Sequence, residues 1–408
     1  MLPHVTVLHR VRGIEVPYLE RIDHHTNSVT YICMRNATDG IPADMAARVA
    51  IVDDMAEAAV IMRDLIHTFG TPEHLVSLSE FDQVAAAELR AEFGIAGYEP
   101  EQILGFRDKL VMGTRVTSAG TQAPPFADAP DTTAVEKFAE VHGYPLIIKP
   151  RLGAASRDIV RIDSADDMSL VPDLTNEPYL VQLFCPDDIG AVDGVWTGTG
   201  LGPWRASRYV GNCLDFAITD NSSLASVEID DDRLNEPLAE FTTAVLAALS
   251  PGMPTVFHLE FFAGDGADRP RLQFLEVGAR ISGGQVTDLW REVHGYDLVG
   301  AAIDCQMGRL PDATPLAGDT ITADLQIHPP ITPPCAVVHT HLDLPAEYRP
   351  YHSSVPEPGT VITETHGYFE IGATFRFRGH STAEVTEAVR RTIGGFRMDC
   401  RPVEPAHA

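Results

Sequence analysis

Short apolar strand-like runs alternate with helix-like segments through the first hundred residues of the chain. The strand-like runs are VTVLH at 5–9, SVTYICM at 28–34, ARVAIV at 47–52 and HLVSLS at 74–79. The segments MAEAAVIMRDLIHTFG and EFDQVAAAELRAEFG have apolar residues at helical spacing. This alternation predicts an α/β unit with a small, mostly parallel sheet. It contains no G-x-G-x-x-G, so a dinucleotide fingerprint is absent.

The character of the sequence changes further along the chain. TSAGTQAPPFADAPD at 117–131 is rich in Pro, Ala and Gly, which predicts a connection into a new unit. A helix, the strand YPLIIKP and a glycine-bearing turn follow there, and GAVDGVWTGTGLG predicts a hairpin. DLWREVHGYDLVGAAIDCQMG at 288–308 predicts one helix, and the chain from about 311 is Pro-rich and β-like. With 408 residues, the chain is expected to form two to four packed units.

The composition argues against nucleic acid and membranes as partners. The 58 acidic and 30 basic residues give a formal net charge of −28, which repels nucleic acid and anionic membrane surfaces. No signal peptide is evident, and no apolar run approaches the roughly 20 residues that span a bilayer. The six cysteines form no CxxC pair, which indicates reduced thiols in a cytoplasmic protein and argues against structural zinc.

Two strand-like runs each carry a glutamate among apolar residues. In VFHLEFF, alternation places His258 and Glu260 on one face, and in RLQFLEVGAR it places Glu276, Gly278 and Arg280 on one face. If these strands are antiparallel neighbours, the two carboxylates lie side by side. Paired carboxylates repel unless a cation lies between them, and Mg²⁺ takes carboxylate and phosphate oxygens. The alternative for either glutamate alone is an exposed strand position.

Cations that could face a phosphate lie earlier in the chain. Lys149 ends the apolar strand PLIIK, where an unpaired lysine would be costly to bury. A turn of small residues follows, whose backbone N–H groups can approach an anion closely. These residues are Gly153, Ala154, Ala155 and Ser156. Lys109, in GFRDKLVM, is expected on a helix leading to the same unit, although a surface lysine is the alternative.

The order of these motifs resembles the ATP-grasp superfamily. A DK-containing helix, a strand ending in Lys-Pro, a small-residue loop, PYLVQLF, HLE and EVGARISGG follow one another across residues 1–310. Within the superfamily, the chain looks like carboxylate–amine ligases of the L-amino acid ligase, dipeptide-forming kind, with a biotin-carboxylase-like architecture. The resemblance implies an ATP-grasp fold with four parts. These are a Rossmann-like domain at 1–105, a lid at 106–180, a metal-binding subdomain at 181–310 and a C-terminal antiparallel-sheet part at 311–408, packing on the catalytic sheet.

The resemblance also implies roles for individual residues. Lys109, Lys149 and the loop 153–156 match the groups that hold ATP phosphates. Glu260 and Glu276 match ligands of Mg²⁺, or Mn²⁺, and Arg280 matches the arginine that faces the acyl phosphate. The hinge that reads adenine corresponds to Gln182, Leu183 and Phe184. The ribose-binding acid is Asp187 or Asp188. Substrate or phosphate contacts are expected from His258, Ser282, Gly283 and Gly284, with a core histidine as the alternative for His258.

One position departs from the family pattern. Many members have E-x-N on the second metal strand, whereas this chain has Gly278. Three functions therefore stay open. The first is an ATP-dependent ligase that forms an amide bond between an amino acid and an amine through an acyl phosphate. The second is a biotin-carboxylase-like or purine-pathway ligase, and the third is a nucleotide-binding module without turnover. The resemblance allows a homodimer and implies small-molecule carboxylate and amine substrates.

Overall fold

The computed structural model describes residues 2–218, 221–266, 269–363 and 371–403. The N-terminal part is a four-stranded parallel sheet of order β3-β2-β1-β4, as the alternation in the sequence predicts. Helices α2 and α3 pack on one face through an apolar cluster that includes Met62 and Leu89. The strands are β1 His4–His9, β2 Ser28–Met34, β3 Arg48–Val52 and β4 His74–Ser77. The helices are α1 Tyr18–Arg21, α2 Ala58–Phe69 and α3 Gln83–Phe93.

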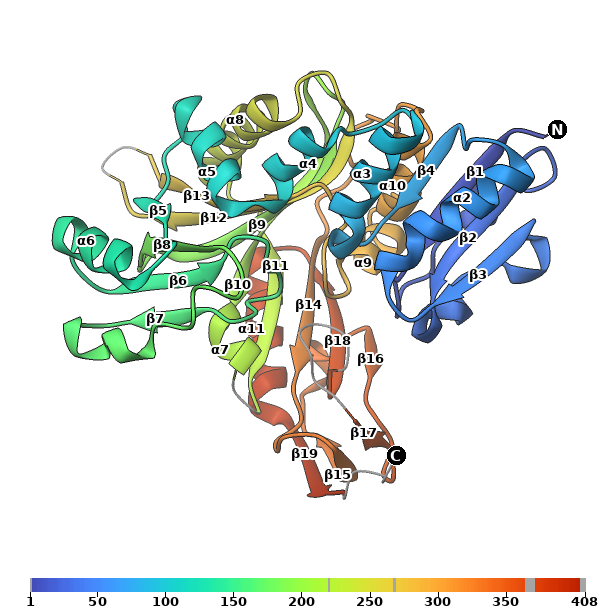
Figure 1. Ribbon diagram of the computed structural model, residues 1–408. Coiled ribbons are helices and arrows are strands. Elements are labelled where there is room, and N and C mark those ends of the chain that lie inside the picture. Colours follow the sequence, from blue (N-terminus) through green and yellow to red (C-terminus); the bar gives the residue numbers. More distant parts are fainter. Residues whose placement is uncertain (1, 219–220, 267–268, 364–370, 404–408) are drawn as a thin grey trace.

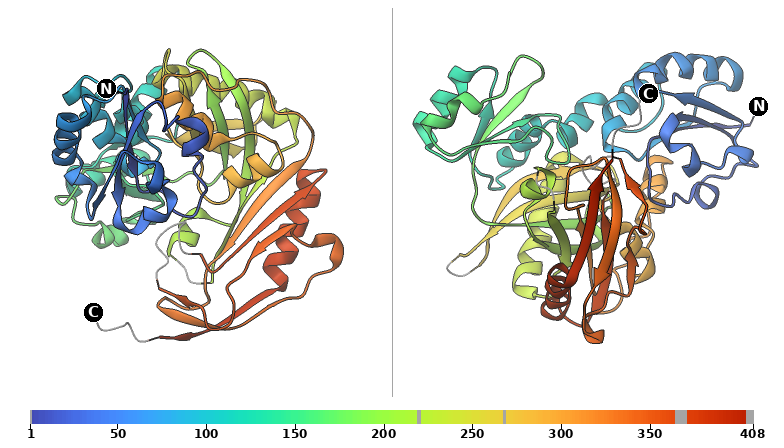
Figure 2. Two further views of the ribbon diagram at one scale, coloured as in Figure 1. Left: turned by 90° about the vertical axis from the view of Figure 1, so that its right-hand side faces the viewer. Right: turned by 90° about the horizontal axis from the view of Figure 1, so that it is seen from below.

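Two helices lead from this unit to a small four-stranded sheet of order β5-β8-β6-β7, called the lid below. Helix α6 covers the lid through Val135 and Phe138. The two connecting helices are α4 Pro100–Arg107 and α5 Lys109–Ser118. The lid comprises β5 Phe126–Asp128, α6 Thr132–His142, β6 Leu146–Pro150, β7 Val160–Ile162 and β8 Tyr179–Leu183. The lid and the N-terminal unit flank opposite sides of the remaining structure (Figures 1 and 2).

The centre of the molecule is an eight-stranded antiparallel sheet of order β13-β12-β9-β10-β11-β14-β18-β16. Helices α8, α4 and α5 pack against one face, which carries Phe257, Leu259 and Phe261. Its first five strands are β13 Arg271–Gly278, β12 Thr255–Gly264, β9 Asp188–Trp196, β10 Leu201–Val210 and β11 Ser223–Glu228. The last three are β14 Ile321–Ile327, β18 Ala373–Gly379 and β16 His352–Ser354. The boundary expected near 311 therefore falls between strands of one continuous sheet.

The remaining elements complete the C-terminal part and the connections. A three-stranded sheet of order β17-β15-β19 lies at the end of the molecule opposite the connecting helices α4 and α5 (Figure 1). Its strands are β17 Val361–Ile362, β15 Cys335–Leu342 and β19 Phe396–Pro402. The helices are α7 Cys213–Ile218, α8 Asp232–Leu249, α9 Val286–Glu292, α10 Leu298–Gln306 and α11 Thr382–Gly395. Among the described residues, no helix combines the length and apolar character needed to cross a membrane, and none of the six cysteines forms a disulfide.

The single helix predicted at 288–308 is wrong. The chain forms α9 and α10, separated at residues 293–297. Gly295 has a φ of +67°, which is incompatible with a continuing right-handed helix. Asp297 then caps α10 by accepting a hydrogen bond from Gly300 N–H. The apolar periodicity runs through both helices, so it concealed the break.

Candidate functional site

The large sheet has one apolar and one polar face where β12 and β13 pair. Leu259 and Phe261 point into the core, whereas Glu260 lies on the opposite face, as strand alternation predicts. The antiparallel register places Glu260 directly opposite Glu276. Two carboxylates sixteen positions apart in the sequence therefore lie side by side on the sheet.

A β-bulge lies immediately beside these carboxylates. Glu260 pairs with Glu276, but Phe261 pairs with Phe274, so Leu275 is the extra residue on β13. The bulge lets Phe261 and Phe274 meet in the core while Glu276 stays on the polar face. It thus keeps both sets of side chains on their proper sides of the sheet.

Lys109 reaches this carboxylate pair from the start of α5. Asp108 caps the helix by accepting hydrogen bonds from the N–H groups of Leu110 and Val111, which fixes Lys109 as the first helical residue. The Lys109 Nζ atom lies 3.1 Å from Glu276 Oε2 and donates to Gly153 O at 2.6 Å. Lys109 therefore connects β13 with the small-residue loop of the lid.

Lys149 approaches from the lid and is buried, with 4% of its surface exposed. Burial lowers the pKa of Lys149 to about 8, although Glu276 and Glu260 partly offset this effect. Burial alone would raise the pKa of Glu276, but Lys109 and Lys149 lower it to about 2. Both lysines and both glutamates thus belong to one electrostatic cluster.

The loop after Lys149 is anchored at its start to the junction of α4 and α5. Arg151 forms an ion pair with Asp108 at 2.6 Å, and Arg107 donates to Leu152 O at 2.8 Å. Beyond this anchor, Ala155 and Ser156 have φ values of +53° and +56°, which non-glycine residues rarely adopt. Backbone strain of this kind concentrates at functional sites.

A small pocket lies between the lid and the large sheet. Its lining combines cationic, polar and apolar side chains: Lys109, Gly113, Ala123, Phe126, Lys149, Leu180, Gln182, Phe274 and Leu275. The structure therefore brings Gln182 together with both lysines. A separate hollow on the N-terminal unit, near Leu19 and Met45, contains none of the predicted site residues.

The hinge residues continue the lid sheet. Leu183 N–H donates to Pro125 O at 2.9 Å, and Phe184 N–H donates to Pro145 O at 3.0 Å. Because Pro125 has no N–H, it cannot return a hydrogen bond to the Leu183 carbonyl. Arg161 lies over the Phe184 ring, with its Cζ atom 4.3 Å from the centroid.

The two acids after the hinge differ in their surroundings. Asp187 forms an ion pair with Arg271 of β13 at 2.7 Å, which occupies its carboxylate. Asp188 begins β9 and is exposed. Of the two, Asp188 has the carboxylate more accessible to a ligand.

His258 lies at the centre of a buried polar network. Its Nδ1 atom is 2.8 Å from Asp193 Oδ1 and 3.2 Å from Ser282 Oγ, and its Nε2 atom is 3.6 Å from Glu260 Oε1. Burial favours the neutral ring, but the Asp193 carboxylate outweighs it and raises the pKa of His258 to about 9. Tyr209 donates to Glu260 Oε1 at 2.8 Å. A cationic imidazole thus borders the carboxylate pair.

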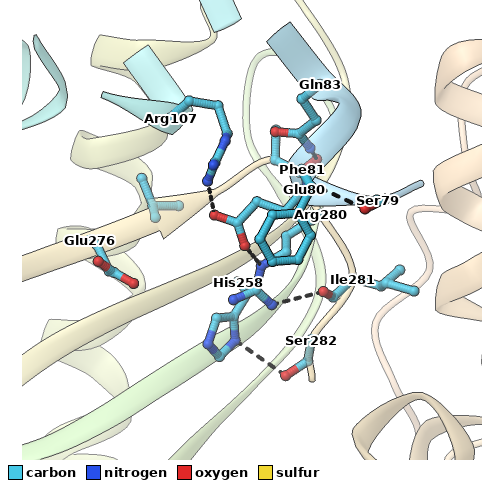
Figure 3. Close-up of polar contacts among 12 residues, drawn as sticks. Ser79, Glu80, Phe81, Gln83, Arg107, His258, Glu276, Arg280, Ile281 and Ser282 are labelled. Carbon is cyan, nitrogen blue, oxygen red and sulfur yellow. Dashed lines mark hydrogen bonds and ion pairs between the residues drawn. The ribbon is translucent and has the colours of Figure 1, made fainter. Parts of the chain in front are cut away.

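Arg280 follows β13 and has a partner that the sequence analysis did not identify. Its Nε atom donates to Glu80 Oε2 at 2.6 Å, and its Nη1 atom donates to Ile281 O at 2.9 Å. Arg107 binds the other oxygen of Glu80. Figure 3 shows Glu80 between the two arginines. Glu80 follows the carboxyl end of β4, and functional side chains often lie at this edge of a parallel sheet. This position was the one feature of the sequence that could have pointed to Glu80.

The glycine-rich segment after Arg280 has two different environments. A Cβ atom on Gly283 would meet nothing within 4 Å, so this residue borders open space. Gly284 has a φ of +63°, and a Cβ atom there would lie 2.4 Å from Asp324 Oδ2. Asp324 and Gln326 of β14 are buried at this contact and were also missed from the sequence.

The residues present could hold a divalent cation only if phosphate or water oxygens complete its coordination. Among the described residues, no group of three or more His, Cys, Asp or Glu side chains could hold a metal. Glu260 and Glu276 offer two carboxylates, and Mg²⁺ typically takes one or two carboxylates plus phosphates and waters. The donor set therefore suits a metal that arrives with a nucleotide.

Comparisons of sequence give short matches to known proteins. No family model matches the chain. A stretch of 123 residues is 31% identical to the L-arginine-specific L-amino acid ligase of Bacillus subtilis and covers 30% of each chain. A stretch of 78 residues is 35% identical to the N5-carboxyaminoimidazole ribonucleotide synthase of Staphylococcus aureus, covering 18% of this chain and 20% of that protein. The chain thus matches less than a third of the length of these curated relatives.

Comparisons of structure extend over nearly the whole chain. The L-amino acid ligase from Bacillus licheniformis superposes with a TM-score of 0.70 at 14% identity, over 97% of this chain and 98% of that chain. The biotin carboxylase domain of a Hydrogenobacter thermophilus 2-oxoglutarate carboxylase, in complex with MgADP, ADP and bicarbonate, gives 0.67 at 15% identity over 97% and 90%. These matches confirm the predicted ATP-grasp fold.

Proposed function

We propose that this chain, which has the ATP-grasp fold, is an ATP-dependent ligase that joins a small carboxylic acid to an amine. The acid is an amino acid, and the product is an amide, most simply a peptide. The observation that carries the proposal is the direct pairing of Glu260 with Glu276, beside Lys109 and Lys149. Such a cluster of two carboxylates and two lysines suits a metal-bound triphosphate.

The pocket between lid and sheet is the proposed nucleotide site. Adenine would lie between the apolar side chains of Phe126 and Phe274, with its amino group directed to the Leu183 carbonyl or the Gln182 side chain. Pro125 leaves that carbonyl without a return hydrogen bond, which supports this assignment. The ribose would face Asp188, and the phosphates would run along Lys149 and the loop 153–156.

Glu260 and Glu276 would hold Mg²⁺, or Mn²⁺, together with the phosphates of ATP. Such an ion neutralises phosphate charge during transfer. Tyr209 keeps the Glu260 carboxylate in place by donating to one of its oxygens. Lys109, bound to Glu276 and to Gly153 O, would bring the loop and β13 together as the nucleotide is enclosed.

The chain's own cations would then act on the substrate. A carboxylate resists attack because of its charge and its poor leaving group, and phosphorylation by ATP corrects both. Arg280 would stabilise the oxyanion that forms when the amine attacks the acyl phosphate. His258 is protonated at neutral pH and would add positive charge on the same face. Ser282 and the open space at Gly283 would border the acid substrate.

A second candidate function is a carboxylating or purine-pathway ligase. It is favoured by the 78-residue match to the ribonucleotide synthase and by the biotin carboxylase fold. Bicarbonate would then replace the amino acid as the activated acid. The third candidate, a nucleotide-binding module without turnover, would follow if glycine in place of asparagine at position 278 removed an essential metal ligand.

As further parts of the proposal, the protein works in the cytoplasm and forms a homodimer through its N-terminal unit.

The test is a screen for phosphate release. Purified protein is incubated with MgATP and pairs of amino acids, with each amino acid alone, and with bicarbonate plus single amines, and products are identified by mass spectrometry. Phosphate release that requires both an acid and an amine, with a product of the summed mass less water, supports the proposal. Bicarbonate-dependent release supports the second candidate. ATP binding without release in any mixture would contradict both enzymatic functions.

A further inference from the structure

The N-terminal unit contributes a side chain to the site of the proposed reaction. Glu80 lies in a short 3₁₀ turn, Glu80–Asp82, between β4 and α3. Its Oε2 atom accepts from Arg280 Nε at 2.6 Å, across 200 positions of sequence. Gln83, at the start of α3, donates to Ala279 O at 2.5 Å, so the turn is docked on the segment that carries Arg280 at two points. Figure 3 shows the Glu80 carboxylate joined to Arg280.

We propose that Glu80 is a positioning residue that sets the orientation of the Arg280 guanidinium. The inference rests on the proposed function, because it concerns the arginine that would face the acyl phosphate. Arg280 is held at Nε by Glu80 and at Nη1 by Ile281 O. Among the described residues, its third nitrogen, Nη2, has no hydrogen-bond partner. With Nε and Nη1 both held, the plane of the guanidinium is fixed and the two N–H groups of Nη2 are left to donate to a substrate oxygen.

Glu80 is itself fixed from the opposite side. Arg107, at the end of α4, binds its Oε1 atom and also donates to Leu152 O at 2.8 Å. The side chains of Glu80 and Arg107 are 16% and 6% exposed. Burial would raise the pKa of Glu80, but Arg280 and Arg107 keep it below its usual range, so the carboxylate stays charged. Through Glu80 and Arg107, the orientation of Arg280 is thus linked to Leu152, just before the small-residue loop 153–156.

The carboxylate also solves an electrostatic problem. The cations of the buried Arg107 and the half-buried Arg280 lie on either side of the Glu80 carboxylate, and without that anion they would repel each other. Removing one partner of a buried charged pair leaves the other uncompensated. Loss of the Glu80 charge should therefore drive the Arg280 side chain to a new position rather than leave it where it is.

A neighbouring ion pair provides a matched control. Asp82 lies two residues further in the same turn, is 1% exposed and pairs with Arg10 at 2.8 Å. It secures the turn but does not contact Arg280. If Glu80 served only to hold the N-terminal unit in place, the variants Glu80→Gln and Asp82→Asn would have similar effects.

The experiment measures kcat, the KM for ATP and the melting temperature of five proteins: the parent, Glu80→Gln, Asp82→Asn, Arg280→Lys and the double variant Glu80→Gln/Arg280→Lys. We expect Glu80→Gln to lower kcat about 10- to 100-fold with KM for ATP within about twofold, and Asp82→Asn to leave kcat nearly unchanged. The double variant should match Arg280→Lys, because Glu80 acts through Arg280. If Glu80→Gln does not fold, Glu80→Asp, which keeps the charge but shortens the side chain, takes its place with the same expectation.

Two kinetic outcomes would overturn the positioning role: a folded Glu80 variant with parental kcat, or losses in the double variant that multiply. A crystal structure of Glu80→Gln gives a readout that needs no activity, since the Arg280 guanidinium should leave its place beside Ile281 O. An unmoved Arg280 would contradict the inference. By contrast, a parent protein that releases no phosphate with any acid and amine would contradict the proposed function, while the structural readout would still decide the role of Glu80.

Discussion

Glu260 and Glu276 stand directly opposite each other on adjacent antiparallel strands, and only Glu276 is ion-paired with a lysine. Like charges at directly opposed positions destabilise a sheet. Glu260 is instead held by a hydrogen bond from Tyr209, which a neutral side chain could also accept. Glu260 also lies 3.6 Å from His258 Nε2, so removing its charge would cost one attraction and relieve one repulsion, whereas the proposed chemistry requires the charge.

The variant Glu260→Gln should separate these two roles. We expect its free energy of unfolding to stay within about 1 kcal/mol of the parent, because the amide oxygen still accepts from Tyr209 and relief of the repulsion from Glu276 offsets the weakened attraction to His258. We expect kcat to fall by at least about 100-fold, because a metal ligand is lost. Urea unfolding and phosphate release measure the two quantities. Glu240→Gln, which removes the same charge from the exposed surface of α8, serves as control; equal losses in both variants would refute the metal assignment.

The buried Lys149 predicts a proton linkage in nucleotide binding. Its pKa of about 8 means that the ammonium form is lost as the pH rises above 8. A bound triphosphate favours the charged form, so ATP binding at pH 8.5 should take up a proton, up to about one per site. Calorimetric titration in buffers of different ionisation enthalpy measures this uptake. Lys149→Met should abolish it and weaken binding, whereas Lys137→Met, on exposed lid helix α6, should change neither.

Strand alternation was sufficient to predict the glutamate pair, because each glutamate lies in a strand-like run directly between two apolar residues. It could not predict the extra residue Leu275, since a bulge depends on which partner residues meet in the core. The pairing of Asp187 with Arg271 is likewise set by the neighbouring strand, 84 positions away. Local sequence therefore identifies which face a residue occupies, and tertiary pairing decides whether its charge is available.

The same limit explains why Glu80 was missed. The residue follows a short parallel strand and is one of 58 acidic residues in the chain. Apart from its place just after that strand, nothing within its own segment distinguishes it from a surface carboxylate. Its role arises because the N-terminal unit docks on the segment after β13. Helix α10 packs against both β4 and β12 and so holds the two units together. Contacts between units are not encoded in local periodicity.

Asp193 and His258 predict a pH dependence of stability. The pKa of His258 is raised from 6.5 to about 9 in the folded protein. The stabilisation is therefore complete below pH 6.5 and is lost as the pH rises through 9. Asp193→Asn should lower the free energy of unfolding by on the order of 2–4 kcal/mol at pH 6, and by much less at pH 9.5.

Denaturant unfolding across this pH range measures the difference. His258→Gln removes the titrating group and should flatten the same part of the stability profile. A pH-independent difference between the parent and Asp193→Asn would show that the ion pair does not hold the proton on His258.

Gly278 can be tested as the position where this chain departs from the E-x-N pattern. A Cβ atom there would lie 2.9 Å from Arg280 Cγ, close to the backbone end of that side chain, so Arg280 must move. We therefore expect Gly278→Ala to lower kcat about 10-fold or more, since the guanidinium would lose its alignment with Glu80. Gly394→Ala, in α11 and away from the site, is the matched control, because a Cβ atom there meets nothing within 4 Å. Gly278→Asn distinguishes the explanations of the departure. If the chain lacked activity for want of an asparagine ligand, this variant would gain phosphate release, whereas a glycine required by Arg280 predicts a loss at least as large as that of Gly278→Ala.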